Sequence, residues 1–272
     1  MSSPTTAATT AWQTAPLLVQ GVELECLRAG QGAPLLVLHD QEYLNTEWPY
    51  LDALAEHFEV LVPSHPGFGR SALPEHFDAL DDLVYVYLDL LRALERRLVR
   101  LAGFGFGGWI AAEMAVRCTH DVDRLLLVDA VGIKVSEPTT RDVADNFVLD
   151  AEALLEATWH DPGLGARTMK LPGPKVPEDD LIALLRNRQA AALFGWKPFM
   201  HNPKLRARLR RIDVPTLVAW GESDRLVSAD YGRAFAAEIP GATFELIPNA
   251  GHFPYLEQPD AFVQRVLPFL SR

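Results

Sequence analysis

The feature that most limits how this 272-residue chain can fold is a regular alternation of short apolar runs with longer segments of helical period. Turn-forming residues bound each run. The pattern is typical of βαβ units, in which helices join parallel strands and cover the sheet, so we predict an α/β fold. Buried strands are expected at Pro34–Leu38, Phe58–Val62, Leu98–Ala102, Arg124–Val128, Thr216–Trp220 and Thr243–Ile247. An alternating segment around Gly21 (Leu17–Leu27) is expected to form a hairpin before them.

The alternation is interrupted once, from about Lys134 to about Pro215, where no strand-like run occurs. A helical insertion between two strands is best explained as a cap over the carboxyl edge of the sheet, where open α/β sheets bind ligands. The insertion contains three helix-like segments, separated by a loop rich in Pro and Gly: helices at 144–159, 178–194 and 204–211, and the loop at 171–177. We therefore predict a flexible tail at 1–15, a core at 16–133 and 212–272, and a helical cap at 134–211.

Composition narrows the ligand class. Lys plus Arg number 25 and Asp plus Glu 36, a net charge of −11, which argues against nucleic acid or an anionic membrane as a partner. No apolar stretch approaches the roughly 18 residues of a membrane-spanning helix. The N-terminus lacks the basic and apolar regions of a secretory signal, and the two cysteines indicate neither a disulfide framework nor a zinc site. We expect a soluble, cytoplasmic protein with a small neutral or apolar ligand and no metal or cofactor.

The most informative motif is Gly103-x-Gly105-x-Gly107, between the strand that starts at Leu98 and a predicted helix at Ile110–Cys118. In a nucleophile elbow, written G-x-S-x-G, the turn is so tight that its flanking positions lack side chains while the central residue presents a hydroxyl above the sheet. Here the context fits an elbow, but Gly105 stands where the nucleophile is expected.

A dinucleotide-binding loop is the competing interpretation of these glycines. Positions 103, 105 and 108 satisfy G-x-G-x-x-G, and Asp129 lies 21 residues beyond Gly108. However, the motif belongs in the first βαβ unit, whereas this strand is at least the third of the sheet. A lone G-x-G-x-x-G is weak, so the downstream residues must decide between the two.

Downstream, one predicted strand ends in a polar turn that contains Asp224, and the next ends in a turn that contains His252. The order elbow, acid, histidine is that of a strand-end catalytic triad. With Leu36-Val-Leu-His39 and the segment Ser64–Ser71, the chain resembles the α/β-hydrolase superfamily from about Leu17 to Phe269. The resemblance implies a mostly parallel, predominantly eight-stranded sheet with helices on both faces and a helical cap before the acid-bearing strand.

The resemblance also implies roles for single residues. His252 is expected to be the general base, and Asp224 the acid that orients its ring. Amides of Phe106 and Gln41 are expected to form the oxyanion hole, although Asp40 replaces the usual glycine and would place a negative charge beside it. His39 and His65 are expected to be structural. We expect Asp40, Phe104, Trp159, Trp196 and His201 to line the substrate site.

Gly105 excludes an acyl-enzyme route, because removal of a triad serine costs about 10⁶ in turnover. Ser223, Ser64 and Cys118 are too poorly placed to replace it. The first interpretation is that a water fills the vacated space and that His252 with Asp224 acts as general base on water or substrate, in hydrolysis, C–C cleavage or related cofactor-free chemistry. We favour it because a binding protein would not need both residues.

Two other interpretations of Gly105 stay open. The glycine can relieve strain in a non-catalytic ligand-binding or scaffold pseudoenzyme, because an elbow residue is held in an unfavourable backbone region. Alternatively, the chain is a serine hydrolase inactivated by a Ser-to-Gly change.

Overall fold

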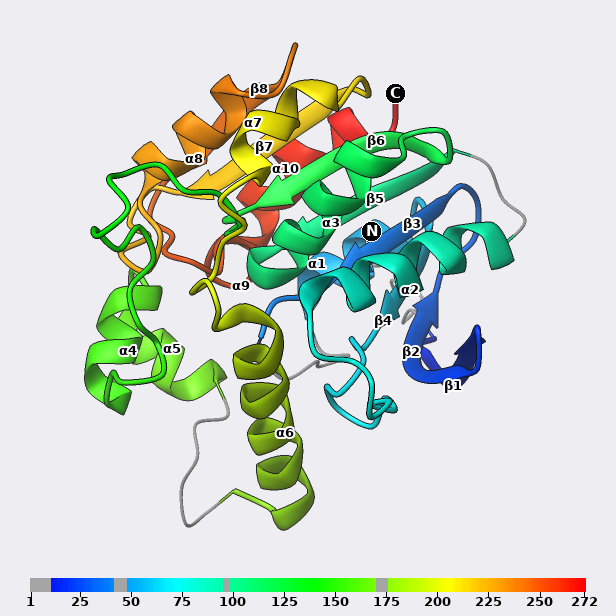
Figure 1. Cartoon of the computed structure of the whole chain (residues 1–272), viewed down its shortest axis with the longest axis horizontal. Coiled ribbons are helices and arrows are strands. Elements are labelled where there is room, and N and C mark those ends of the chain that lie inside the picture. Colours follow the sequence, from blue (N-terminus) through cyan, green and yellow to red (C-terminus); the bar gives the residue numbers. More distant parts are fainter. Residues whose placement is uncertain (1–10, 42–47, 95–97, 170–175) are drawn as a thin grey trace, which may run out of the picture.

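The structure, a computed structural model, describes residues 11–41, 48–94, 98–169 and 176–272 (Figure 1). Residues 1–10 of the predicted tail and 171–175 of the predicted loop lie outside the described residues.

One eight-stranded sheet forms the centre of the molecule, which confirms the predicted fold class. Its strand order is β1-β2-β4-β3-β5-β6-β7-β8. The first two neighbouring pairs are antiparallel, so β1 and β2 form the predicted hairpin, and all later pairs are parallel. The strands are β1 (Gln13–Val19), β2 (Val22–Ala29), β3 (Pro34–Leu38), β4 (Glu59–Pro63), β5 (Val99–Phe104), β6 (Val122–Val128), β7 (Thr216–Gly221) and β8 (Thr243–Ile247).

The central strands β3 to β7 are buried on both faces because they are apolar at successive positions. Within β3, Leu36 and Leu38 belong to one core cluster, which includes residues of the helices at 80–93, 105–117 and 229–237, whereas Leu35 and Val37 belong to a second cluster, which includes residues of the helices at 49–55 and 259–270. The helices are α1 (Pro49–Ala55), α2 (Leu80–Ala93), α3 (Gly105–Arg117), α4 (Ala151–Thr158), α5 (Pro162–Thr168), α6 (Glu178–Gly195), α7 (Leu205–Arg208), the 3-10 helix η1 (Leu209–Arg211), α8 (Ala229–Ala237), α9 (Pro254–Glu257) and α10 (Pro259–Leu270).

The segment between β6 and β7 contains α4 to α7 and η1, and no strand among its described residues. Figure 1 shows α4, α5 and α6 projecting away from the sheet in the lower part of the view. The helix predicted at 144–159 is wrong in its first half. Helix α4 begins only at Ala151, because the Asp150 side chain accepts the Ala153 N–H and caps the helix there. In the described part of the chain, no helix is both long and apolar enough to cross a bilayer.

Candidate active site

The carboxyl ends of the parallel strands bring the main predicted residues to one edge of the sheet. Asp40 follows β3, Gly105 follows β5, Asp224 follows β7, and His252 follows β8. Residues far apart in the sequence meet here because all these strands run in the same direction and end at the same edge.

The turn from β5 into α3 is as tight as the glycine pattern predicts. A Cβ added to Gly103 would lie 2.5 Å from the Gly107 carbonyl oxygen, and one added to Gly107 would lie 2.1 Å from the Leu38 carbonyl oxygen. Gly105, the first residue of α3, has a φ of 47°, in the left-handed region that side chains disfavour. The turn is therefore closely packed, with a left-handed residue at its centre; its identity as a nucleophile elbow stays a prediction.

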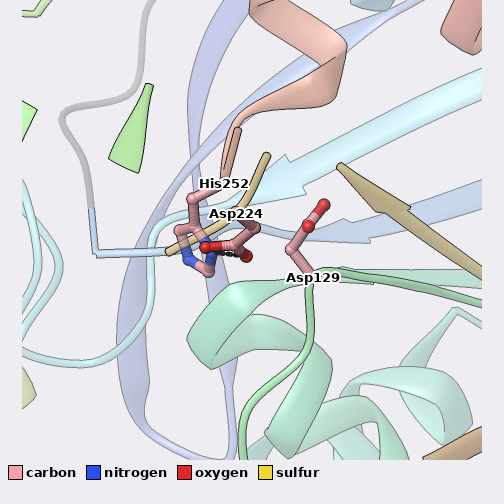
Figure 2. Close-up of side chains that lie close together, drawn as sticks. All are labelled: Asp129, Asp224 and His252. Carbon is pink, nitrogen blue, oxygen red and sulfur yellow. Dashed lines mark hydrogen bonds and ion pairs between the residues drawn. The ribbon is translucent and has the colours of Figure 1, made fainter. Parts of the chain in front are cut away.

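Asp224 and His252 form a buried pair. His252 Nδ1 donates to Asp224 Oδ2 at 2.7 Å, as Figure 2 shows. The other carboxylate oxygen accepts the backbone N–H groups of Leu226 and Val227 at 2.9 and 3.0 Å. These three donors fix the carboxylate, so it can hold the imidazole in one orientation.

Asp40 occupies the space above Gly105. A Cβ added to Gly105 would lie 2.2 Å from the Asp40 carboxyl carbon. Asp40 Oδ1 accepts the Phe106 N–H at 2.7 Å, and Oδ2 lies 3.2 Å from His252 Nε2. The carboxylate thus fills the space that we expected to hold a water, and it uses the Phe106 amide that we expected to stabilise an oxyanion.

His252 is held as a cation. Burial alone would lower its pKa, but the charge and hydrogen bond of Asp224, together with the hydrogen bond and charge of Asp40, outweigh burial and raise the pKa well above the usual value. Both ring nitrogens therefore carry protons at neutral pH and point at carboxylates. In this state His252 is a proton donor and has no free nitrogen to accept a proton.

The aromatic residues that flank Gly105 are both buried. Phe104 is 1% exposed, and its ring packs 4.7 Å from that of Tyr255, within the core on one face of the sheet. Phe106 is fully buried on the other face, 6.0 Å from the ring of Phe68. Both side chains are core residues, because β5 and α3 direct them to opposite sides of the sheet.

Gln41 connects the Asp40 loop to the segment between β6 and β7. Its side-chain amide donates to the Met200 sulfur at 3.9 Å, and its carbonyl oxygen accepts from Asn146 at 3.2 Å. The role of the Gln41 backbone amide in an oxyanion hole stays a prediction.

Among the other predicted substrate residues, Trp159 lies next to the turn that contains His252, because the His252 N–H donates to the carbonyl oxygen of Thr158 at 2.6 Å. Trp159 is fully buried against Phe253. Trp196 is 51% exposed and packs with Phe199. His201 borders two cavities, of about 390 and 280 Å³, whose linings do not include Asp40, Asp224 or His252. The contribution of these residues to substrate binding remains a prediction.

His39 and His65 are placed as structural residues. Their rings stack 4.0 Å apart, and His65 Nε2 donates to the His39 carbonyl oxygen at 2.8 Å. Burial lowers the pKa of His39 to about 4 and that of His65 well below its usual value. Both rings are therefore neutral, and they join the ends of β3 and β4.

One acid in this cluster was not predicted to belong to it. Asp129, directly after β6, lies near Asp224 and His252 (Figure 2). All three residues are buried, and one side-chain oxygen or nitrogen atom of each lies within 4.8 Å of such an atom of the other two. The sequence contained a signal, because Asp129 ends a parallel strand just as Asp224 does. It had been considered only as the acid of a dinucleotide-binding motif.

Comparisons with known proteins agree with this fold. The family model described as "Alpha/beta hydrolase family" matches residues 32–265. The chain is 24% identical to the pimeloyl-[acyl-carrier protein] methyl ester esterase of Vibrio cholerae, over 90% of this chain and 96% of that protein. It is 25% identical to a 2-hydroxy-6-oxo-2,4-heptadienoate hydrolase of Pseudomonas putida, over 94% and 95%. A solved serine hydrolase involved in carbazole degradation superposes with a TM-score of 0.75, at 23% identity over 96% and 99%.

Proposed function

Because the chain belongs to the α/β-hydrolase family, we propose that it is a hydrolase-type enzyme that acts on a small, largely apolar molecule without an acyl-enzyme intermediate. In this proposal Gly105 stands at the nucleophile position, where it offers no group that can be acylated. The reactive groups are instead Asp40 and His252, and Asp224 holds the His252 ring in place.

One observation carries the proposal: the Asp40 carboxylate lies over Gly105, between the Phe106 N–H and His252 Nε2. A carboxylate beside an imidazolium offers a base and an acid at one point. Asp40 takes a proton from the substrate or from a water, and the Nε2–H of His252 donates to the anion that forms. This assignment changes our expectation that His252 is the base, because both of its nitrogens already carry protons.

The placement of Asp40 also favours one type of reaction. An acyl transfer creates an oxyanion that needs donors such as the Phe106 N–H, and Asp40 already accepts from that group. A reaction that begins with proton abstraction, such as C–C cleavage or elimination, needs no such donor at the start. Proton abstraction from the substrate is therefore the step that the geometry supports best.

The named relatives indicate which compounds to test first. We would assay methyl esters and 2-hydroxy-6-oxo dienoates, the compound types in the names of the two curated relatives. Turnover should resist a fluorophosphonate, which labels serine nucleophiles. It should fall by about 10²–10⁴-fold in Asp40→Asn and in His252→Ala, the range that general acid–base catalysis contributes. Asp230→Asn is the matched control, because the side chain of Asp230 is 97% exposed.

Unchanged turnover in Asp40→Asn would show that Asp40 is not the base. If fluorophosphonate abolished turnover in the unmodified protein, a nucleophile other than the groups assigned here would carry the reaction, and the proposal would be wrong.

A non-catalytic binding protein is the second candidate. This candidate is favoured because the Asp40 carboxylate already bonds to the Phe106 N–H and to His252, the groups that a hydrolase offers to its substrate. A serine at position 105 would require the Asp40 side chain to move, because its Cβ would lie 2.2 Å from the carboxyl carbon. The interpretation as a serine hydrolase inactivated by a Ser-to-Gly change therefore requires another conformation of Asp40 in the active enzyme.

Combined Asp40→Gly and Gly105→Ser substitutions separate the two candidates. We expect the double variant to react with fluorophosphonate and Gly105→Ser alone to react far less. If the unmodified protein turns over none of the compounds while the double variant shows an esterase burst, the binding interpretation is the correct one.

A further inference from the structure

The proposed chemistry leaves one buried acid unused. Asp129 follows β6 with a φ of 44°, a left-handed conformation that Asp and Asn adopt more readily than other side-chain-bearing residues. Its backbone N–H donates to the Ala219 carbonyl oxygen of β7 at 3.1 Å. The Asp129 side chain lies near Asp224 and His252 at this edge of the sheet, as Figure 2 shows.

The hydrogen bonds of Asp129 are incomplete for a carboxylate. The side chain is almost wholly buried, with 1% of the residue exposed. Its Oδ1 accepts the Gly221 N–H at 2.9 Å, but Oδ2 has no hydrogen-bond partner within the described part of the chain. An ionised oxygen buried without a donor is strongly unfavourable, so a charged Asp129 does not fit its surroundings.

Asp224, in contrast, has the donors that an ionised carboxylate requires. It accepts two backbone N–H groups on Oδ1 and His252 Nδ1 on Oδ2. Two adjacent ionised carboxylates would repel one another in this buried place. A single proton on Asp129 removes that repulsion and converts the unpartnered oxygen into a donor.

We propose that Asp129 is held as a neutral carboxylic acid whose O–H donates to the Asp224 carboxylate, and that it thereby acts as a positioning residue for the Asp224–His252 pair. The positioning role rests on the proposed function, because that pair is the one assigned there to hold and donate the proton. With His252 also protonated, the four groups Asp40, Asp129, Asp224 and His252 carry one net negative charge instead of three.

The surroundings of Asp129 act in the same direction. Burial and the nearby charge of Asp224 raise the pKa of Asp129 well above its usual value, and His252 only partly opposes them. A divalent cation is the other way to satisfy the cluster, since Asp129, Asp224 and His252 each offer a ligand atom. A cation on His252 Nδ1, however, would have to replace its 2.7 Å hydrogen bond to Asp224.

The test counts protonated aspartates in the full chain. Aspartate labelled with ¹³C at its carboxyl carbon reports in NMR whether each side chain is ionised. At pH 7 we expect one carboxyl per chain with the chemical shift of a neutral acid, and we expect it to be missing in Asp129→Asn. Asp142→Asn is the matched control, because hydrogen bonds from Lys134 and Ser136 lower the pKa of Asp142 to about 2 despite its burial, and its removal should leave the neutral signal in place.

The positioning role needs a second readout, the titration of His252 followed by ¹⁵N NMR of its ring. Asparagine keeps an N–H donor for Asp224, so the midpoint in Asp129→Asn should stay near that of the unmodified protein. In Asp129→Ala, Asp224 loses a donor and its charge acts more strongly on the ring, so the midpoint should rise. Equal midpoints in all three proteins would overturn the positioning role.

Two results would overturn the neutral acid itself: ionised shifts for every aspartate at pH 7, or one equivalent of bound metal that Asp129→Asn loses. Neither readout requires a substrate. A neutral Asp129 in a protein without turnover would therefore contradict the proposed function and leave the neutral acid intact.

Discussion

Two groups of buried histidines lie at the same edge of the sheet, and their pKa values are shifted in opposite directions. His39 and His65 follow β3 and β4 and bond to each other, to the Asp40 carbonyl oxygen and to the Tyr87 hydroxyl. None of these partners carries a charge, and burial lowers the pKa of His39 to about 4. These rings are neutral.

His252 is just as buried but contacts two carboxylates, and its pKa is raised instead. Asp40 belongs to both groups: its backbone carbonyl oxygen bonds to His39, and its carboxylate bonds to His252. The difference shows that burial favours the neutral ring only until a carboxylate is close enough to outweigh desolvation. The same residue type thus forms a neutral pair and a charged ring at one edge of the sheet.

The largest effect is expected from Asp224→Asn, which removes the nearest carboxylate and keeps an acceptor for the N–H groups of Leu226 and Val227. The pKa of His252 should fall, and turnover on any substrate found should drop by about 10³–10⁴-fold, because an Asn no longer holds the ring as a charged donor. Ring ¹⁵N NMR and kcat measure the two effects. His39 and His65 serve as internal controls, since their shifts should not change.

If His252 kept its midpoint in Asp224→Asn while turnover fell, Asp224 would act through geometry alone. The contrast between the two histidine groups would then not be one of nearby charge.

The two groups should also determine different limbs of the pH–stability curve. The pKa of His39 is lower in the folded state than in the unfolded chain, so the unfolded chain binds more protons between pH 6.5 and 4. The unfolding free energy should fall as pH drops through this window, by roughly 3 kcal/mol from His39. The pKa of His252 is raised, so its contribution is fully present below about pH 6.5 and is lost as pH rises through the folded-state value.

Urea unfolding from pH 4 to 9 measures both limbs. His39→Asn should flatten part of the acid limb, since His65 also contributes there, and should leave the alkaline limb alone. His252→Asn should flatten the alkaline limb and leave the acid limb alone. Identical slopes in both variants and in the unmodified protein would mean that neither ring determines the pH dependence.

The strand-end residues could be predicted because direction and order are encoded locally. Apolar runs fix the strands, parallel strands end at one edge, and Asp224 and His252 each follow such a run, so their meeting required no knowledge of side-chain packing. The glycines at 103 and 107 were equally predictable, because each faces backbone or side-chain atoms that leave no room for a Cβ.

The position of Asp40 could not be predicted in the same way. Its carboxylate bonds to an amide that follows β5 and to a ring that follows β8, so its rotamer depends on three separate segments. The sequence predicts an acid beside the oxyanion hole, whereas the Asp40 carboxylate accepts the Phe106 N–H that was predicted to form the hole. The start of α4 was missed for a more local reason, because helical period continues upstream of the capping residue Asp150.

A smaller effect is expected when Asp40 is pushed away from His252. In Gly105→Ala the new methyl group would meet the Asp40 carboxyl group, and the backbone φ of 47° at position 105 is unfavourable for alanine. The unfolding free energy should therefore fall by about 1–3 kcal/mol. The pKa of His252 should fall while that of His39 stays low. Adding Asp40→Gly should recover the part of the loss that comes from the contact. If the changes in unfolding free energy of the two single variants simply add in the double variant, the two positions do not interact.

The smallest effect is expected from Tyr87→Phe, which tests the neutral pair. His65 Nε2 donates to the His39 carbonyl oxygen, so in a neutral ring Nδ1 must accept, and the Tyr87 hydroxyl lies 2.5 Å from it. Burial raises the pKa of Tyr87, so the phenol keeps the proton that it donates. Loss of this donor should lower the unfolding free energy by about 1–2 kcal/mol and leave turnover and the His252 titration unchanged. Altered turnover would show that the pair acts on the reactive ring through Asp40, and the two histidine groups would then be one coupled unit.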